Sequence, residues 1–164
     1  SQITSTDTLA DNGRFHRVDL PLLPDSILAT LSLAELLTAS PRLSKLSAAL
    51  SSDGSLLTEL DSTQETTFFA MSDTVLRDSG TDLTALSAEM RDTFLTNHLF
   101  DEQLDTDALS ERSDITARSG AVHTVEYDID FSLNGETTIL WEDIQSSNGI
   151  LHIIDGVLSS DAAQ

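Results

Sequence analysis

One short segment occurs twice in this chain, and the repeat constrains the fold more than any other feature of the sequence. Residues 12–25 and 148–161 agree at six of fourteen aligned positions, where unrelated segments would share about one. The offset of 136 residues is about the length of one domain. We therefore predict that the second copy closes a domain over residues 27–164, and that residues 1–26 are a linker that includes the closing segment of a preceding repeat.

The chain is strongly acidic. Its 28 Asp and Glu residues outweigh 8 Lys and Arg residues, which gives a formal net charge of −20. Nucleic-acid phosphates and anionic lipid surfaces would repel such a protein, so we expect neither as a partner. Because the acidic residues are spread along the whole chain, we interpret them as a salt-adapted surface. No apolar run approaches the ~18 residues of a membrane span.

The densest acidic cluster offers divalent-cation binding as an alternative interpretation. It comprises Asp101, Glu102, Asp105 and Asp107. The cluster lacks the central glycine and the terminal glutamate of a dedicated calcium loop. We therefore predict no specific metal site and no cofactor, and leave looser cation binding by the acidic clusters open.

Motifs of catalysis are missing from the sequence. It has no cysteine, which excludes disulfides and thiolate chemistry. It has no nucleophile elbow, helical zinc motif or phosphate-binding glycine loop. The four histidines, at positions 16, 98, 123 and 152, show no metal-ligand spacing. A paired-carboxylate site stays open in so acidic a chain, but we expect no enzyme.

Helical patterning dominates the first half of the domain. Apolar residues follow helical spacing from Ser26 until Pro41 interrupts, and a second helix follows over residues 43–50. Ser87 can cap a third helix, which leads to His98. In contrast, residues 1–11 are polar and without a period, which predicts little order.

Strand patterning dominates the second half. Residues 67–70 form a short buried run, and residues 123–131 alternate between apolar and polar types. Asn134-Gly135 is a strong hairpin signal, and residues 150–154 have the composition of a central strand. Because helices come first and hairpins last, the predicted class is α+β with segregated layers.

Two motifs resemble those of the fasciclin domain family. Residues 148–158 read NGILHIIDGVL and are similar to the box that closes fasciclin domains. Residues 67–73 read TFFAMSD and resemble an earlier box of the family, with methionine in place of proline. The matching residues are Thr67, Phe68, Phe69, Ala70, Asn148, Gly149, His152 and Asp155. The resemblance implies a fasciclin-like fold, in which N-terminal helices pack on a twisted antiparallel or mixed β-sheet wedge.

The closing box also has a structural explanation in its residue types. Gly149 permits a positive φ in a turn. His152, alone among aliphatic neighbours, needs a hydrogen-bond partner inside the core, and Asp155 can accept from donors where the strand ends. We therefore expect the box to hold the fold and not to bind a ligand.

The resemblance further implies a binding surface. Residues 95–99 resemble the Tyr-His segment linked to integrin contact in animal fasciclin domains, with Asn97 in place of the tyrosine. The predicted surface is centred on Asn97, His98, Leu99, Phe100 and Asp101. Leu99 and Phe100 are equally well explained as core residues, and that alternative stays open.

Fasciclin domains are extracellular or cell-surface modules, often in tandem, that mediate adhesion. The resemblance therefore implies a noncatalytic module, located outside the cell, at the cell surface or in the periplasm. Its partner would be a cell-surface or matrix protein or a polysaccharide. The open alternatives are a small-molecule or lipid-binding module with a cleft between helices and sheet, an acid-pair hydrolase, and a passive spacer.

Overall fold

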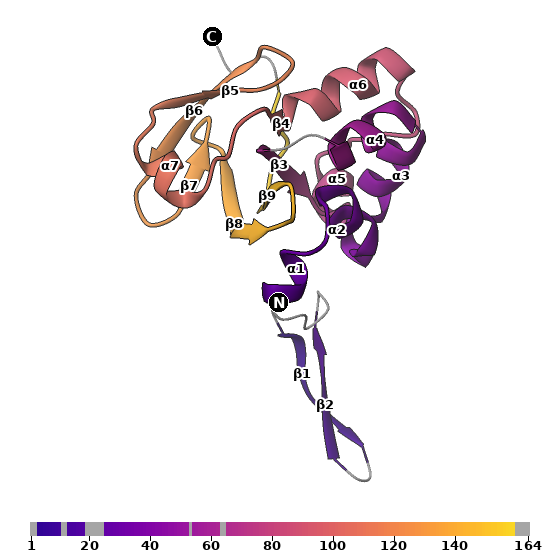
Figure 1. Cartoon of the computed structure of the whole chain (residues 1–164). Coiled ribbons are helices and arrows are strands. Elements are labelled where there is room, and N and C mark those ends of the chain that lie inside the picture. The colour runs from indigo at the N-terminus through magenta and orange to yellow at the C-terminus, as the bar shows by residue number, and fades with distance from the viewer. Residues whose placement is uncertain (1–2, 11–12, 19–24, 53, 63–64, 160–164) are drawn as a thin grey trace.

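The computed structural model describes residues 3–10, 13–18, 25–52, 54–62 and 65–159, which form helices and two separate sheets (Figure 1). The helices are α1 (Asp25–Leu28), α2 (Leu33–Ala39), η1 (Pro41–Leu43), α3 (Ser44–Ser52), α4 (Gly54–Ser62), α5 (Asp73–Asp78), α6 (Ala88–Asn97) and α7 (Thr106–Ser110). The strands are β1 (Ile3–Ala10), β2 (Gly13–Val18), β3 (Thr66–Met71), β4 (Leu99–Phe100), β5 (Asp114–Thr116), β6 (Val122–Tyr127), β7 (Phe131–Leu133), β8 (Thr137–Gln145) and β9 (Gly149–Ile154).

The larger sheet has seven strands in the order β4-β3-β9-β8-β7-β6-β5. Strand β9 lies inside it, parallel to β3 and antiparallel to β8. Every residue of β9 and of β3 is buried. This agrees with the apolar runs in the sequence, which are typical of strands covered on both faces. The sheet is therefore mixed, and the α+β class predicted from the sequence is confirmed.

Most helices gather at one end of this sheet, whereas α7 lies beside β6 at the other end. Figure 1 shows α2 to α6 gathered beside β3, β4 and β9, while β5 to β8 extend away from them. The core between the two layers contains fully buried Leu37, Leu46 and Leu60 from the helices, and Phe68 and Phe69 from β3. Burial of these apolar side chains, at about 25 cal/mol per Å², drives the packing of helices on the sheet.

The single helix predicted from Ser26 to Pro41 is wrong, because the structure breaks it into α1 and α2. Ser32 caps α2: its hydroxyl accepts from the Glu35 backbone at 3.2 Å, and the Glu35 carboxylate accepts from the Ser32 backbone at 2.9 Å. This capping box satisfies two amides that a new helix leaves free. The Ser-x-x-Glu pattern is present in the sequence, and it marks the start of α2.

The alternating strand predicted over residues 123–131 is also shorter than expected. Strand β6 ends at Tyr127, and a loop leads to β7, so Tyr127 and Ile129 are exposed at 65% and 84%. The predicted hairpin at Asn134-Gly135 is confirmed, with φ values of 55° and 67°. Positive φ at both central residues defines the turn that matches the twist of paired strands.

Other differences concern segments without strong patterning. Residues 3–10 form strand β1, antiparallel to β2, although the polar composition of residues 1–11 predicted little order. The short helices α4, α5 and α7 and strand β5 were not predicted. The predicted helices over residues 43–50 and after Ser87 are confirmed as α3 and α6, and Ser87 caps α6 by accepting from the Met90 backbone at 3.3 Å.

Candidate interaction surfaces

The segment predicted as a binding surface lies mostly in the core. Asn97 is 5% exposed, and His98, Leu99 and Phe100 are fully buried at the end of α6 and in β4. Only Asp101 is exposed. For Leu99 and Phe100 the structure thus agrees with the core alternative, and Asp101 is the one residue of the segment that a partner could reach directly.

His98 joins α6 to the end of the chain's closing segment. Its Nδ1 lies 2.7 Å from the Phe94 carbonyl oxygen, so Nδ1 donates, and its Nε2 accepts from the Leu158 backbone at 2.9 Å. The ring is therefore the neutral tautomer with hydrogen on Nδ1. Burial disfavours the charged form and lowers the pKa of His98 to about 4.

The other two histidines with described side chains are also structural. His152 donates from Nε2 to the Leu104 carbonyl at 2.6 Å, and its Nδ1 accepts from the Asp143 backbone at 3.3 Å. His123 accepts at Nδ1 from the Asn134 side chain at 3.0 Å. Burial lowers the pKa of both rings. Both ring nitrogens of His98 and His152 are thus paired inside the core, whereas the Nε2 of His123 has no hydrogen-bond partner among the described residues.

Aromatic contacts connect two of these histidines through the core. Phe69 stacks on His152 at a centroid distance of 4.9 Å and meets Phe100 edge to face at 5.2 Å. Phe100 in turn lies 6.1 Å from His123. The early box in β3, the predicted binding segment and the closing box thus pack into one continuous row.

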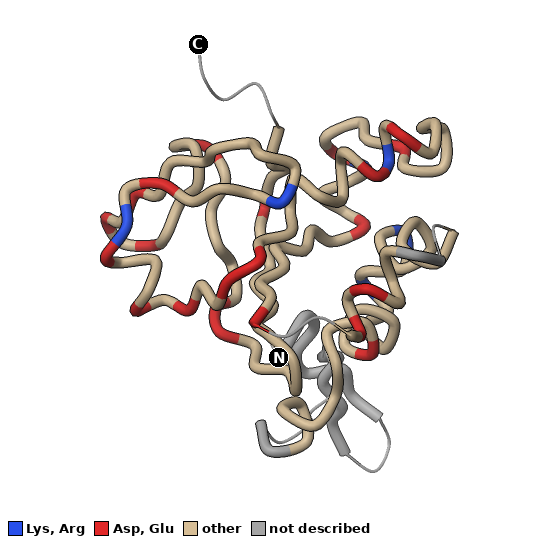
Figure 2. Tube along the Cα trace, turned by 45° about the horizontal axis from the view of Figure 1, so that its top comes forward, with Lys and Arg blue, Asp and Glu red and all other residues tan. Residues whose placement is uncertain are grey.

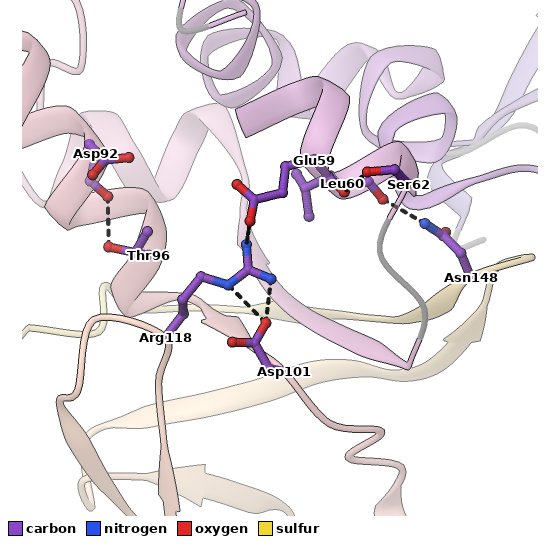
Figure 3. A network of polar contacts seen from close by, with 8 residues as sticks. All are labelled: Glu59, Leu60, Ser62, Asp92, Thr96, Asp101, Arg118 and Asn148. Atoms are coloured by element: carbon purple, nitrogen blue, oxygen red, sulfur yellow. Dashed lines mark hydrogen bonds and ion pairs between the residues drawn. The ribbon is translucent and has the colours of Figure 1, made fainter. Parts of the chain in front are cut away.

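The closing box ties the helices to the sheet. The Asn148 side chain accepts from the Leu33 backbone at 2.9 Å, which holds the start of α2, and donates to the Leu60 carbonyl at 2.5 Å, which holds the end of α4 (Figure 3). Asp155 accepts from the Thr138 backbone at 2.7 Å and fastens β9 to β8. These contacts give the box a structural role that needs no ligand.

Position 149 requires glycine because two strand backbones lie close together there, and not because of the positive φ expected from the sequence. It lies in β9 directly beside β3, and a Cβ at this position would stand 1.9 Å from the Thr66 carbonyl oxygen. Its φ is not among the positive values of the described residues. The prediction about its backbone conformation is therefore wrong, and glycine is required because two backbones meet there.

The acidic cluster after β4 is used in local contacts. Figure 3 shows the Arg118 guanidinium between Asp101 and Glu59, with its Nε 2.8 Å from Asp101 and its Nη1 3.2 Å from Glu59. Glu102 pairs with Arg112 at 2.7 Å, and Asp105 caps α7. Among the residues with described positions, no group of three His, Asp or Glu side chains is arranged to hold a metal ion.

A loop between β6 and β7 presents the most exposed apolar side chains of the described core domain. It runs from Tyr127 to Phe131, and we call it the 127–131 loop. Tyr127 packs on Phe131 at a centroid distance of 4.6 Å, which fixes its ring while 65% of the residue stays exposed. Ile129 is 84% exposed between two exposed aspartates. A rigid aromatic ring beside an exposed aliphatic group is typical of an interaction surface.

A groove separates the N-terminal helices from the sheet, and we call it the helix–sheet groove. It has a volume of about 820 Å³. Its helical wall includes Leu28, Leu31 and Leu36, and its sheet wall includes Trp141, Ile144 and Ile153. Strand β8 bulges beside it, where Asp143 has a φ of 53° and the β8–β9 register shifts. Bulges commonly re-aim side chains beside functional sites.

The mixed sheet, the helices gathered at one end of it and the buried closing box define an α+β domain. A family model of the fasciclin domain matches residues 41–160. The structure is similar to a FAS1 domain pair from the insect cell adhesion molecule fasciclin I, with a TM-score of 0.67 and 19% sequence identity. This match covers 96% of the present chain and 59% of that chain. No curated protein matches the sequence.

The chain therefore belongs to the fasciclin domain family. Members of this family are adhesion modules that are typically extracellular or attached to the cell surface. In the described part of the chain, no helix is long and apolar enough to cross a membrane.

Proposed function

We propose that this chain is a noncatalytic adhesion module that works outside the cell, at its surface or in the periplasm, and binds its partner through the 127–131 loop. The observation that carries the proposal is the exposure of Tyr127 and Ile129 on a loop whose neighbouring strands are well packed. Other members of the alternating pattern, such as His123 and Val125, are buried. At this loop the apolar face of strand β6 thus leaves the core, and its side chains are available to contact a partner.

The chemistry of the loop favours a protein or matrix partner. Tyr127 and Ile129 would enter an apolar site, and the flanking Asp128 and Asp130 would face basic residues around it. An acidic polysaccharide would be repelled by these aspartates and by the net charge of −20. Figure 2 shows acidic residues along both the sheet and the helices, and this distribution of negative charge favours basic partners and suits a salt-rich exterior.

A binding experiment with loop variants tests the proposal. The purified chain is measured against a panel of extracellular matrix proteins and polysaccharides by surface plasmon resonance at constant salt. The double variant Tyr127→Ala with Ile129→Ala removes both exposed anchors and is expected to weaken binding at least about tenfold, because hot-spot side chains commonly contribute that much. Circular dichroism checks that the variant is folded.

Met90→Ala serves as the matched control, since Met90 is an apolar residue of α6 that is 59% exposed. Its binding should equal that of the unaltered chain. Equal binding by the loop variant, or no binding of the unaltered chain to any member of the panel, would contradict the proposal.

The surface predicted around residues 97–101 stays a second proposal, carried by Asp101. Its carboxylate pairs with Arg118, whose side chain is only 17% exposed, so the aspartate is held in one position on the surface. Asp101→Asn should weaken partner binding if this surface is used. Unchanged affinity, measured in the same assay, would remove it.

We also propose that the natural protein carries fasciclin domains in tandem, and that residues 1–26 join this domain to a preceding one. Strand β2 (Gly13–Val18) and strand β9 (Gly149–Ile154) have the same bounds at the offset of 136 residues that relates the repeated segments. The similar structure is itself a domain pair, of which this chain spans 59%.

A further inference from the structure

The walls of the helix–sheet groove are apolar but incompletely buried. Leu28 and Leu31 on the helical side, and Trp141 and Ile144 on the sheet side, are only partly buried while packing against the core. Their exposed apolar area contributes nothing to folding while it faces water. An apolar ligand body would gain stabilisation from covering it, and about 820 Å³ is within the usual size of a small-molecule site.

A buried hydroxyl without a partner lies in the same groove. Ser40 lines it, is 6% exposed, and has a side-chain oxygen with no hydrogen-bond partner among the described residues. It precedes η1 without capping that helix through its side chain. Because buried polar groups are normally paired, an unpaired hydroxyl at a cavity wall points to a missing polar group.

Carboxylates line one region of the groove. Glu142, Asp143 and Asp130 all belong to its lining, which includes no Lys or Arg among the described residues. Burial, and then the neighbouring Asp143 and Asp130, raise the pKa of Glu142. Asp143 is already engaged, because it accepts from the Thr106 backbone at 2.9 Å and from the Thr106 hydroxyl at 2.5 Å. A bound cation would therefore reduce the electrostatic repulsion at Glu142 more than at Asp143.

A basic side chain lines a second hollow beside the groove. Arg42 lines this adjoining space of about 180 Å³, which shares Ser40, Leu43, Leu140, Trp141 and Ile153 with the groove. The three carboxylates would repel a ligand with an anionic head group, whereas they would attract a cationic head group.

We propose that the helix–sheet groove binds a small amphipathic amine, with its apolar body between the helices and β8 and its ammonium group at Glu142. A polar atom along the body of a natural ligand would pair with the Ser40 hydroxyl, and simple alkyl amines lack such an atom. The groove shares Asp130 with the 127–131 loop, but this function does not rest on the adhesion proposed for that loop.

Trp141 makes the proposal directly measurable, because it is the only tryptophan of the chain and lines the groove. Its fluorescence is followed during titration with dodecylamine, dodecanol and dodecanoic acid, each below its micelle concentration. The amine should change the emission and saturate, the alcohol should bind more weakly, and the acid should bind at least about tenfold more weakly than the amine. Equal affinities for amine and acid would overturn the proposal.

Two pairs of variants distinguish binding in the groove from nonspecific binding elsewhere on the surface. Ala39→Phe fills the groove from an exposed position of α2 and should abolish the response, whereas Ala48→Phe, the same change at an exposed position of α3, should leave it intact. Glu142→Gln should lower the affinity for dodecylamine about tenfold, and Glu136→Gln, in an exposed turn outside the groove, should not.

Size-exclusion chromatography identifies the competing occupant. If a second copy of the chain covered the groove, the unaltered protein would elute as a dimer, Ala39→Phe would elute as a monomer, and dodecylamine would give no saturable response. That outcome would overturn the proposal, as would an equal amine response from Ala39→Phe.

Discussion

We expect three buried histidines to make the stability of this domain sensitive to acid. His98, His123 and His152 are each fully buried, each has a hydrogen-bond partner in the core, and the pKa of each is lowered mainly by burial. An unfolded chain would expose all three to water, where a histidine pKa is about 6.5. Unfolding therefore takes up protons at mildly acidic pH.

The sign of the pH effect follows from His98. Above pH ~6.5 the His98 ring is neutral in both the folded and the unfolded state, so its contribution to stability is fully present. As the pH falls from ~6.5 to about 4, the ring takes up a proton only in the unfolded state, and that contribution is lost. The free energy of unfolding should fall by roughly 3 kcal/mol over this window from His98 alone. His98→Gln should be less stable at pH 7 and should lose stability less steeply on acidification.

Urea unfolding at pH 7, 6, 5 and 4.5 checks this prediction. The slopes of the unaltered protein and of His98→Gln should differ by an amount approaching about 1.4 kcal/mol per pH unit near pH 5. Identical slopes would show that His98 is protonated in the folded state, against the tautomer assigned from its contacts.

At the scale of single residues, the sequence showed which side chains are polar or titratable, but it did not show which of them are exposed. The need of His152 for a partner in the core follows from its aliphatic neighbours, and the Leu104 carbonyl supplies that partner at 2.6 Å. Nothing local distinguishes buried His98 from exposed Asp101, because a partner of the buried His98 ring, the Leu158 backbone, is distant in sequence. The helix–sheet groove has no local signal, since its two walls are about 100 residues apart.

At the scale of elements, the parallel contact between β3 and β9 joins the two halves of the domain. Six residue pairs connect the strands from Thr66 opposite Gly149 to Met71 opposite Ile154. The sequence predicted both strands from their apolar runs, but not that they lie side by side, because parallel neighbours require a long crossover whose path is set by tertiary packing. Similarly, the capping box at Ser32 overrode the apolar spacing that predicted one continuous helix.

Gly149→Ala tests the closeness of these strands. The added Cβ would lie 1.9 Å from a backbone oxygen of β3, which cannot move without breaking the sheet. We expect a loss of at least about 3 kcal/mol in the free energy of unfolding, or failure to fold.

Gly80→Ala is the control for this change. Gly80 has a φ of 72° and nothing within 4 Å of an added Cβ, so only backbone strain of about 1 kcal/mol is expected. Denaturant unfolding measures both variants. A Gly149→Ala protein as stable as Gly80→Ala would contradict the close approach of β3 and β9.

At the scale of the whole molecule, buried motifs hold the fold and exposed segments are left for binding. The family boxes lie in β3 and β9, and their side chains connect helices, sheet and the end of the domain. The two most exposed large apolar side chains of the described residues lie elsewhere, on the 127–131 loop. This division explains why the sequence identified the family through its boxes while the exposed loop, which sequence patterning assigned to a strand, emerged only from the structure.

The central claim is that the repeated segment closes fasciclin domains, one copy in this domain and the other in a neighbour. His152 and His16 occupy equivalent positions in the two copies. The claim predicts that His152→Ala removes a buried hydrogen bond and a ring stacked on Phe69, which lowers the free energy of unfolding by about 3 kcal/mol or more. It also predicts that His16→Ala, in the same chain, changes it by no more than about 0.5 kcal/mol.

Urea unfolding of the two variants beside the unaltered chain is the most direct measurement. A large loss for His152→Ala with none for His16→Ala is the predicted result. Equal losses would contradict the account, because the first copy would then be part of this domain's own core and not the closing segment of a neighbour.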